Sequence, residues 1–269
     1  MSWNLFSKEL KRNAYSLITW MLIITLLITL TMSVYPTFLK NQSQILGMFS
    51  IIPKEALQFK GISDINALLS VLGFYAANNV IYMMVLGSIY AIVLASNILL
   101  KEEYNKTAEY LLTRPLTRSE IFVSKLGIII LNVMILNLVT SVAGLICLEL
   151  FKTGPFSVKA FAILSIYTLL LNFLFGTIGL FVSTLMKRAR PITSFCIGIV
   201  LFFYFIYTIS KITTSIAKIG YLSPFRFVNL DAINPAYKLN FWHLCYFLGI
   251  SVILILLSHY FYKRKDIYT

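Results

Sequence analysis

Long uncharged apolar runs alternate with short charged segments along this chain of 269 residues. Six runs are long enough to cross a bilayer as helices, which takes roughly 20 apolar residues. They cover about residues 14–39, 71–100, 126–148, 160–186, 191–210 and 239–262. Strands of a membrane barrel would instead alternate within segments of about ten residues. The pattern therefore predicts an all-α integral membrane protein with six transmembrane helices.

Composition agrees with this fold class. Hydrophobic residues make up 59% of the chain and charged residues 12%, whereas soluble domains carry about 25% charged residues. We see no internal repeat, no low-complexity segment and no stretch with the composition of a soluble domain. Residues 1–269 are therefore treated as a single transmembrane domain.

The net charge of +13 raises the question of nucleic-acid binding. With six spans both termini lie on one side, and fourteen of the 23 Lys and Arg residues fall on that side. The other nine are spread over longer loops. Because basic residues concentrate in cytoplasmic segments, the distribution predicts cytoplasmic termini and disfavours nucleic acid as a partner.

The segment before the first run has an amphipathic pattern. Trp3, Phe6 and Leu10 recur at i, i+3 and i+7, and the basic residues lie off that stripe. This is typical of a short helix lying in the membrane interface, and we predict one over about residues 2–12. The alternative is an ordinary basic flank of the first span. The residues expected at the interface are Trp3, Phe6, Lys8, Lys11 and Arg12.

A charged loop, residues 101–125, separates the second and third runs. A helical pattern over residues 102–112 ends before Pro115, because the residue preceding a proline avoids helical geometry. Thr117 is then a good N-cap, and Glu120 three residues later completes a capping box. The sequence predicts a helix, a sharp turn and a capped helix that continues into the third span.

This loop resembles the first cytoplasmic loop of type-2 ABC exporter permeases. The shared pattern is paired acids, a threonine, an acid, two leucines, a proline, an arginine and a lysine. In this sequence the pattern reads Glu102, Glu103, Thr107, Glu109, Leu111, Leu112, Pro115, Arg118, Ile121 and Lys125. Lys106 stands where the family usually has glycine. The segment YLSPFRF at 221–227 is also similar to the family's.

The resemblance implies a transmembrane subunit that pairs with a second permease copy or homologue, above two cytoplasmic ABC ATPase subunits. It implies that the loop is a coupling helix that fits a groove on the ATPase. The coupling residues carried over are Glu102, Glu103, Thr107, Glu109, Arg114, Pro115 and Arg118. Lys125 is expected to anchor the third span at the lipid headgroups. For each charge the plainer alternative is a solvated helix face.

The chain lacks the phosphate-binding pattern G-x-x-x-x-G-K-[ST]. We therefore expect no cofactor on this chain, with ATP and Mg bound by the partner ATPase. The three cysteines and two histidines have no metal-site spacing. No ionisable group lies near the centre of a predicted span, so an intramembrane enzyme is disfavoured. Asparagines within the spans are expected to hydrogen-bond between helices.

These observations predict the permease subunit of an ABC exporter in a bacterial cytoplasmic membrane. Because the spans offer no charged ion site, we expect an amphiphilic substrate, such as a peptide, an antibiotic or a lipid-linked molecule. Two alternatives stay open. One is a membrane scaffold or sensor that binds an ATPase without transport, and the less favoured one is an intramembrane enzyme.

Overall fold

A computed structural model describes residues 3–44, 47, 66–104, 117–186, 192–212, 214–232, 234 and 237–264. Of residues 3–5, 66–67, 100–104 and 214–215 it describes the backbone only. Within these ranges the ordered elements are all helical. Six of the helices are long and apolar enough to cross a membrane, which confirms the predicted fold class.

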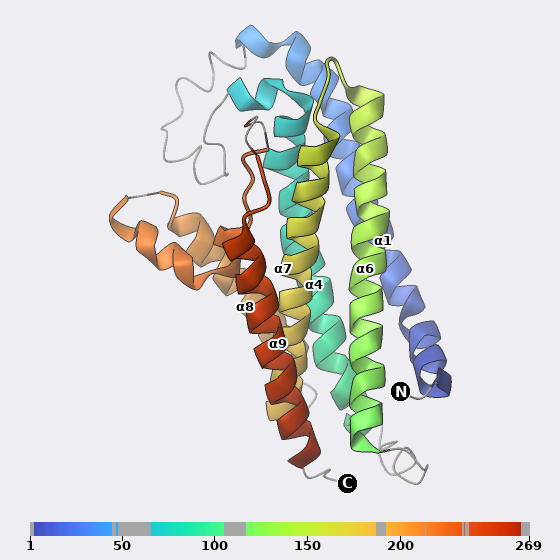
Figure 1. Cartoon of the computed structure of the whole chain (residues 1–269). Coiled ribbons are helices and arrows are strands. Elements are labelled where there is room, and N and C mark those ends of the chain that lie inside the picture. Colours follow the sequence, from blue (N-terminus) through green and yellow to red (C-terminus); the bar gives the residue numbers. More distant parts are fainter. Residues whose placement is uncertain are drawn as a thin grey trace.

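The six long helices form one elongated bundle (Figure 1). They are α1 (Trp3–Lys40), α4 (Val71–Tyr104), α6 (Arg118–Phe151), α7 (Val158–Leu185), α8 (Ile192–Ile209) and α9 (Phe241–Arg264). Each corresponds to one of the apolar runs. Several extend beyond the run, because a helix can continue through the polar residues that flank an apolar run.

The predicted break between an interfacial helix and the first span is absent. Helix α1 runs without interruption from Trp3 to Lys40, so segments 2–12 and 14–39 are one element. No proline or glycine lies near their junction, and Asn13 donates its side-chain amide to the Glu9 carbonyl, 3.0 Å away, within the helix. The boundary predicted near residue 13 is therefore wrong.

Helices α4 and α7 form the centre of the bundle, and small residues let them approach closely. A Cβ added at Gly179 of α7 would lie 3.0 Å from the Cα of Ile92 in α4, and closer still to its carbonyl oxygen. A Cβ at Gly176 would lie 3.3 Å from Ile129 of α6. Backbones at this separation gain dispersion contacts that lipid tails cannot match.

Buried amides join the central helices, as the sequence predicts. Asn172 of α7 accepts a hydrogen bond from Ser88 of α4 (3.1 Å) and donates one to Asn137 of α6 (3.3 Å). Tyr90 of α4 donates to Asn132 of α6 at 3.1 Å. Asn79 differs, since neither of its buried side-chain polar atoms has a partner among the described residues.

The segment between α8 and α9 folds back along α8 as two 3₁₀ helices, η2 (Thr214–Leu222) and η3 (Pro224–Phe227) (Figure 1). Ser223 donates to the Phe203 carbonyl of α8, 2.7 Å away. Phe225 is fully buried and packs on Phe175 of α7. Buried side chains such as Phe225 thus hold this irregular segment against the bundle.

Candidate functional site

The connection between α4 and α6 is the candidate coupling site. Helix α4 continues straight through Glu102 and Glu103 and ends at Tyr104. These two acids therefore lie on the last turn of the second span's own helix, and the predicted helix 102–112 does not start separately. The predicted residues Thr107, Glu109, Arg114 and Pro115 lie outside the described residues.

The exit from the loop is held by the predicted capping box. The Thr117 hydroxyl accepts a hydrogen bond from the Glu120 backbone N–H at 3.2 Å. In return the Glu120 carboxylate accepts from the Thr117 backbone N–H at 3.0 Å. Two otherwise unpaired N–H groups are satisfied, so the prediction that a capped helix begins at Thr117 is confirmed.

Arg118 and Ser119 tie the start of α6 to the end of α9. The Arg118 guanidinium donates to the Lys263 carbonyl at 3.2 Å, and Ser119 lies within hydrogen-bonding distance of His259, 3.2 Å away. The Phe122 ring packs on His259, with centroids 5.1 Å apart. The candidate coupling residue Arg118 is therefore also a contact between two helices. His259 belongs to the same contact.

The first turns of α1 reach the same end of the bundle, which we call the loop end: the ends of α4 and α9 and the starts of α1 and α6 (Figure 1). Phe6 is partly buried there, and a Cβ added at Gly127 of α6 would lie 3.5 Å from its ring. Phe6 therefore packs on neighbouring helices, while its place in the lipid interface stays a prediction.

The place of the basic residues of this turn at the membrane interface stays a prediction. Lys8, Lys11 and Arg12 are exposed to the surroundings of the chain. Of Trp3 only the backbone is described. An apolar stripe on a helix fits a lipid surface and a protein surface equally well, so the sequence pattern did not show that Phe6 packs on neighbouring helices.

Sequence reasoning missed Glu9, an acid that is only 2% exposed. Its carboxylate forms an ion pair with Arg12 and accepts a weaker hydrogen bond from Asn13 at 3.4 Å. The signal was available, because Glu9 lies three residues after Phe6, beside the apolar stripe, and no other acid occurs before Glu55. A buried carboxylate needs such partners to offset its lost hydration.

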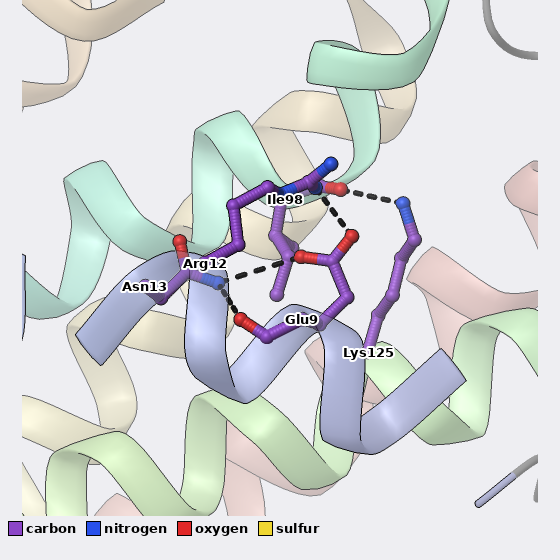
Figure 2. Close-up of polar contacts among 5 residues, drawn as sticks. All are labelled: Glu9, Arg12, Asn13, Ile98 and Lys125. Atoms are coloured by element: carbon purple, nitrogen blue, oxygen red, sulfur yellow. Dashed lines mark hydrogen bonds and ion pairs between the residues drawn. The ribbon is translucent and has the colours of Figure 1, made fainter. Parts of the chain in front are cut away.

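Lys125 of α6 is also fully buried, and this corrects its predicted place at the headgroups. Its ammonium donates to the Ile98 carbonyl of α4, 2.6 Å away. Figure 2 shows this contact beside the Glu9–Arg12 pair of α1. A lysine reaches headgroups only from a lipid-facing position, whereas Lys125 points from α6 into the bundle.

The described residues hold no group of three or more His, Cys, Asp or Glu side chains suited to a metal ion. At the loop end, polar contacts of Lys125 join α6 to α4 and those of Arg118 and Ser119 join α6 to α9, while α1 packs there through Phe6. A force applied at this end of the bundle can therefore pass from one helix to the next.

Comparison with protein families shows which family the chain belongs to. A family described as ABC-2 family transporter protein matches residues 3–267. Comparison with curated proteins finds no match. The match covers all six long helices and the connection between α4 and α6. The chain therefore belongs to the ABC-2 family, and it is a transmembrane permease of a type-2 ABC transporter.

Proposed function

We propose that this permease is the membrane subunit of an ABC exporter in the bacterial cytoplasmic membrane, with both termini in the cytoplasm. Residues 101–118 form its docking surface for separate ABC ATPase subunits. Binding and hydrolysis of ATP on those subunits displace the loop, and the displacement shifts the spans between inward-open and outward-open arrangements.

The observation that carries this proposal is the way in which helices hold both ends of the loop. The described part of α4 runs without a break to Tyr104, and α6 begins after a two-way capping box at Thr117. The start of α6 is in turn bound to the end of α9 by Arg118. A loop whose two ends are fixed to rigid helices passes its displacement on to those helices. A loop with flexible ends would move without moving the helices.

Charge supports the proposed side of the membrane. The loop end gathers the basic residues of the N-terminal turns, of the loop and of the last turn of α9. Lys and Arg favour the cytoplasmic side of short loops. The acids Glu102 and Glu103 then meet the cytosol, where charged side chains contribute to partner choice and orientation more than to stability.

A second permease copy or a homologue completes the proposed transporter. Helices α1 and α8 present apolar side chains outward, including Leu22, Leu26, Phe202 and Phe205. These faces suit lipid or another permease. Apart from Glu9 and Lys125 near the loop end, the buried polar side chains of the described spans are uncharged. A neutral interior favours an amphiphilic substrate, such as a peptide, an antibiotic or a lipid-linked molecule.

Copurification tests the docking role. The permease carrying Glu102→Lys and Glu103→Lys should recover at least tenfold less ATPase than the wild type at equal permease yield, because like charges now face the partner. Glu149→Lys is the matched control, since Glu149 is an exposed acid at the opposite end of α6, paired with Lys152. Equal ATPase recovery by the charge-reversed permease would contradict the proposal.

A further inference from the structure

Lys125 and Ile98 lie on the two helices that carry the proposed docking loop. Ile98 is within the last two turns of α4, and Lys125 is in the third turn of α6. Their contact closes the base of the loop, because the chain between them leaves α4 and returns to α6. A bond at this point holds the two helix ends at a set separation.

The contact is strong and protected. The Lys125 ammonium donates to the Ile98 carbonyl oxygen at 2.6 Å, and the side chain is fully buried. Hydrogen bonds from a charged donor are shorter and stronger than neutral ones. A helix carbonyl has two lone pairs, so Ile98 accepts this bond without giving up its place in α4.

Helix α1 places the Glu9 carboxylate, which is paired with Arg12, in the same region. It packs against both α4 and α6, and the Glu9 side chain is almost completely covered there. Figure 2 shows Glu9 and Arg12 of α1 gathered with Lys125 about the backbone of Ile98. Burial of an ammonium costs less free energy where a carboxylate lies nearby.

We propose that Lys125 is a positioning residue for coupling, which latches α4 to α6 below the docking loop so that both helices move as one unit. This role rests on the proposed function, because it concerns how motion of the loop reaches the spans.

A simpler role must be separated from this one. Lys125 would also be retained if it served only to neutralise the buried Glu9. The two roles differ in what happens when both charges are removed. The double variant Glu9→Gln with Lys125→Met leaves no buried charge at this place, since Arg12 is exposed, but it still lacks the donor to Ile98.

The first test measures the helix ends in the permease alone, in lipid nanodiscs. Spin labels are placed at Tyr104→Cys on α4 and at Val123→Cys, an exposed position on α6, in a background without Cys147, Cys196 and Cys245. We expect a narrow distance distribution in the wild type and one at least twice as wide in Lys125→Met. Lys125→Arg, which keeps a charged donor, should restore most of the narrow distribution.

The double variant and a surface control decide the result. Glu9→Gln with Lys125→Met should stay as wide as Lys125→Met, and Lys8→Met, which removes an exposed lysine of α1, should match the wild type. A narrow distance distribution in Lys125→Met would overturn the proposed latch. So would a narrow distance distribution in the double variant. If Lys125→Met does not fold, the double variant alone decides between the two outcomes.

The second test uses the complex with the ATPase. A third label at Leu185→Cys, an exposed position at the end of α7, reports how far Tyr104 and Val123 each move when ATP and vanadate are added. In the wild type the 104–185 and 123–185 distances should change by equal amounts. In Lys125→Met the two changes should differ at least twofold, while ATPase recovery stays unchanged. Equal shifts in that variant would count against the latch. Failure of any ATPase to copurify with the wild type would instead contradict the proposed function.

Discussion

The Arg118 guanidinium donates a hydrogen bond to the Lys263 carbonyl, 3.2 Å away, so the first residue of α6 caps the last turn of α9. The last four carbonyls of a helix lack partners within the helix, and a cation near them is favoured by the helix dipole. One side chain thus joins the start of the third span to the end of the sixth.

Replacing Arg118 should loosen the end of α9. We expect Arg118→Ala to speed amide exchange over residues 258–264 several-fold, at a cost of about 1 kcal/mol, the usual net value of one hydrogen bond. Hydrogen–deuterium exchange in nanodiscs measures this. Lys263→Ala is the control, because the acceptor is the backbone carbonyl and survives the substitution. Unchanged exchange in Arg118→Ala would show that the contact does not hold α9.

Side-specific labelling tests the orientation. Thr117 and Thr153 are both exposed, at opposite ends of α6 and its following turn. With the three native cysteines replaced, Thr153→Cys should react with a membrane-impermeant thiol reagent in intact cells. Thr117→Cys should react only after the cells are opened. The reverse pattern would place the docking loop outside and end the coupling proposal.

The close approach of α4 and α7 should be intolerant of added volume. A Cβ at Gly179 meets the backbone of Ile92, which cannot rotate away as a side chain can. We expect Gly179→Ala to destabilise the protein by about 1–3 kcal/mol, the usual cost of overpacking, and to lower its melting temperature in detergent. Gly198→Ala on α8 is the matched control, since nothing lies within 4 Å of its added Cβ. A Gly179→Ala protein as stable as this control would contradict the packing.

Lys211, just after α8, should titrate unusually low for a lysine. Burial and then the nearby positive charge of Arg226 lower its pKa to about 8, and its ammonium lies 4.4 Å from the centre of the Tyr207 ring. Amine-reactive labelling of Lys211, followed by peptide mass spectrometry, should reach half of its maximal rate near pH 8.

The lowered pKa of Lys211 also determines whether the stability of the protein rises or falls with pH. Between about pH 8 and pH 10.5, the ordinary lysine value, the unfolded chain holds a proton at Lys211 that the folded chain does not. This residue's contribution to the free energy of unfolding therefore rises with pH across that interval. Arg226→Gln should raise the labelling midpoint by removing one of the two causes. A midpoint above pH 10 in the wild type would contradict the burial of Lys211.

The capped start of α6 was predictable because its causes are local. Thr117 and Glu120 are three residues apart and satisfy each other's backbone groups whatever the rest of the chain does. The six spans were predictable for a related reason, since each depends on the summed hydropathy of its own residues. Glu102 and Glu103 were placed on a helix correctly, although the helix proved to be a continuation of α4.

Local patterns could not show which surfaces Phe6, Glu9 and Lys125 contact. An amphipathic turn shows the same periodicity whether its apolar face meets lipid or protein, and a lysine near a span end suits a headgroup as well as a buried carbonyl. Which surface each residue meets depends on how α1, α4 and α6 pack together, far apart in the sequence.

The chain by itself therefore determined the membrane class, the number of spans, the capped helix start and the candidate docking loop, because hydropathy and capping act within a few turns. The tertiary structure decided that α1 is continuous, that Glu9 is buried and that Lys125 binds Ile98. The direction in which a helix points its side chains within a bundle is set by the neighbours it packs against, and no local pattern encodes those neighbours.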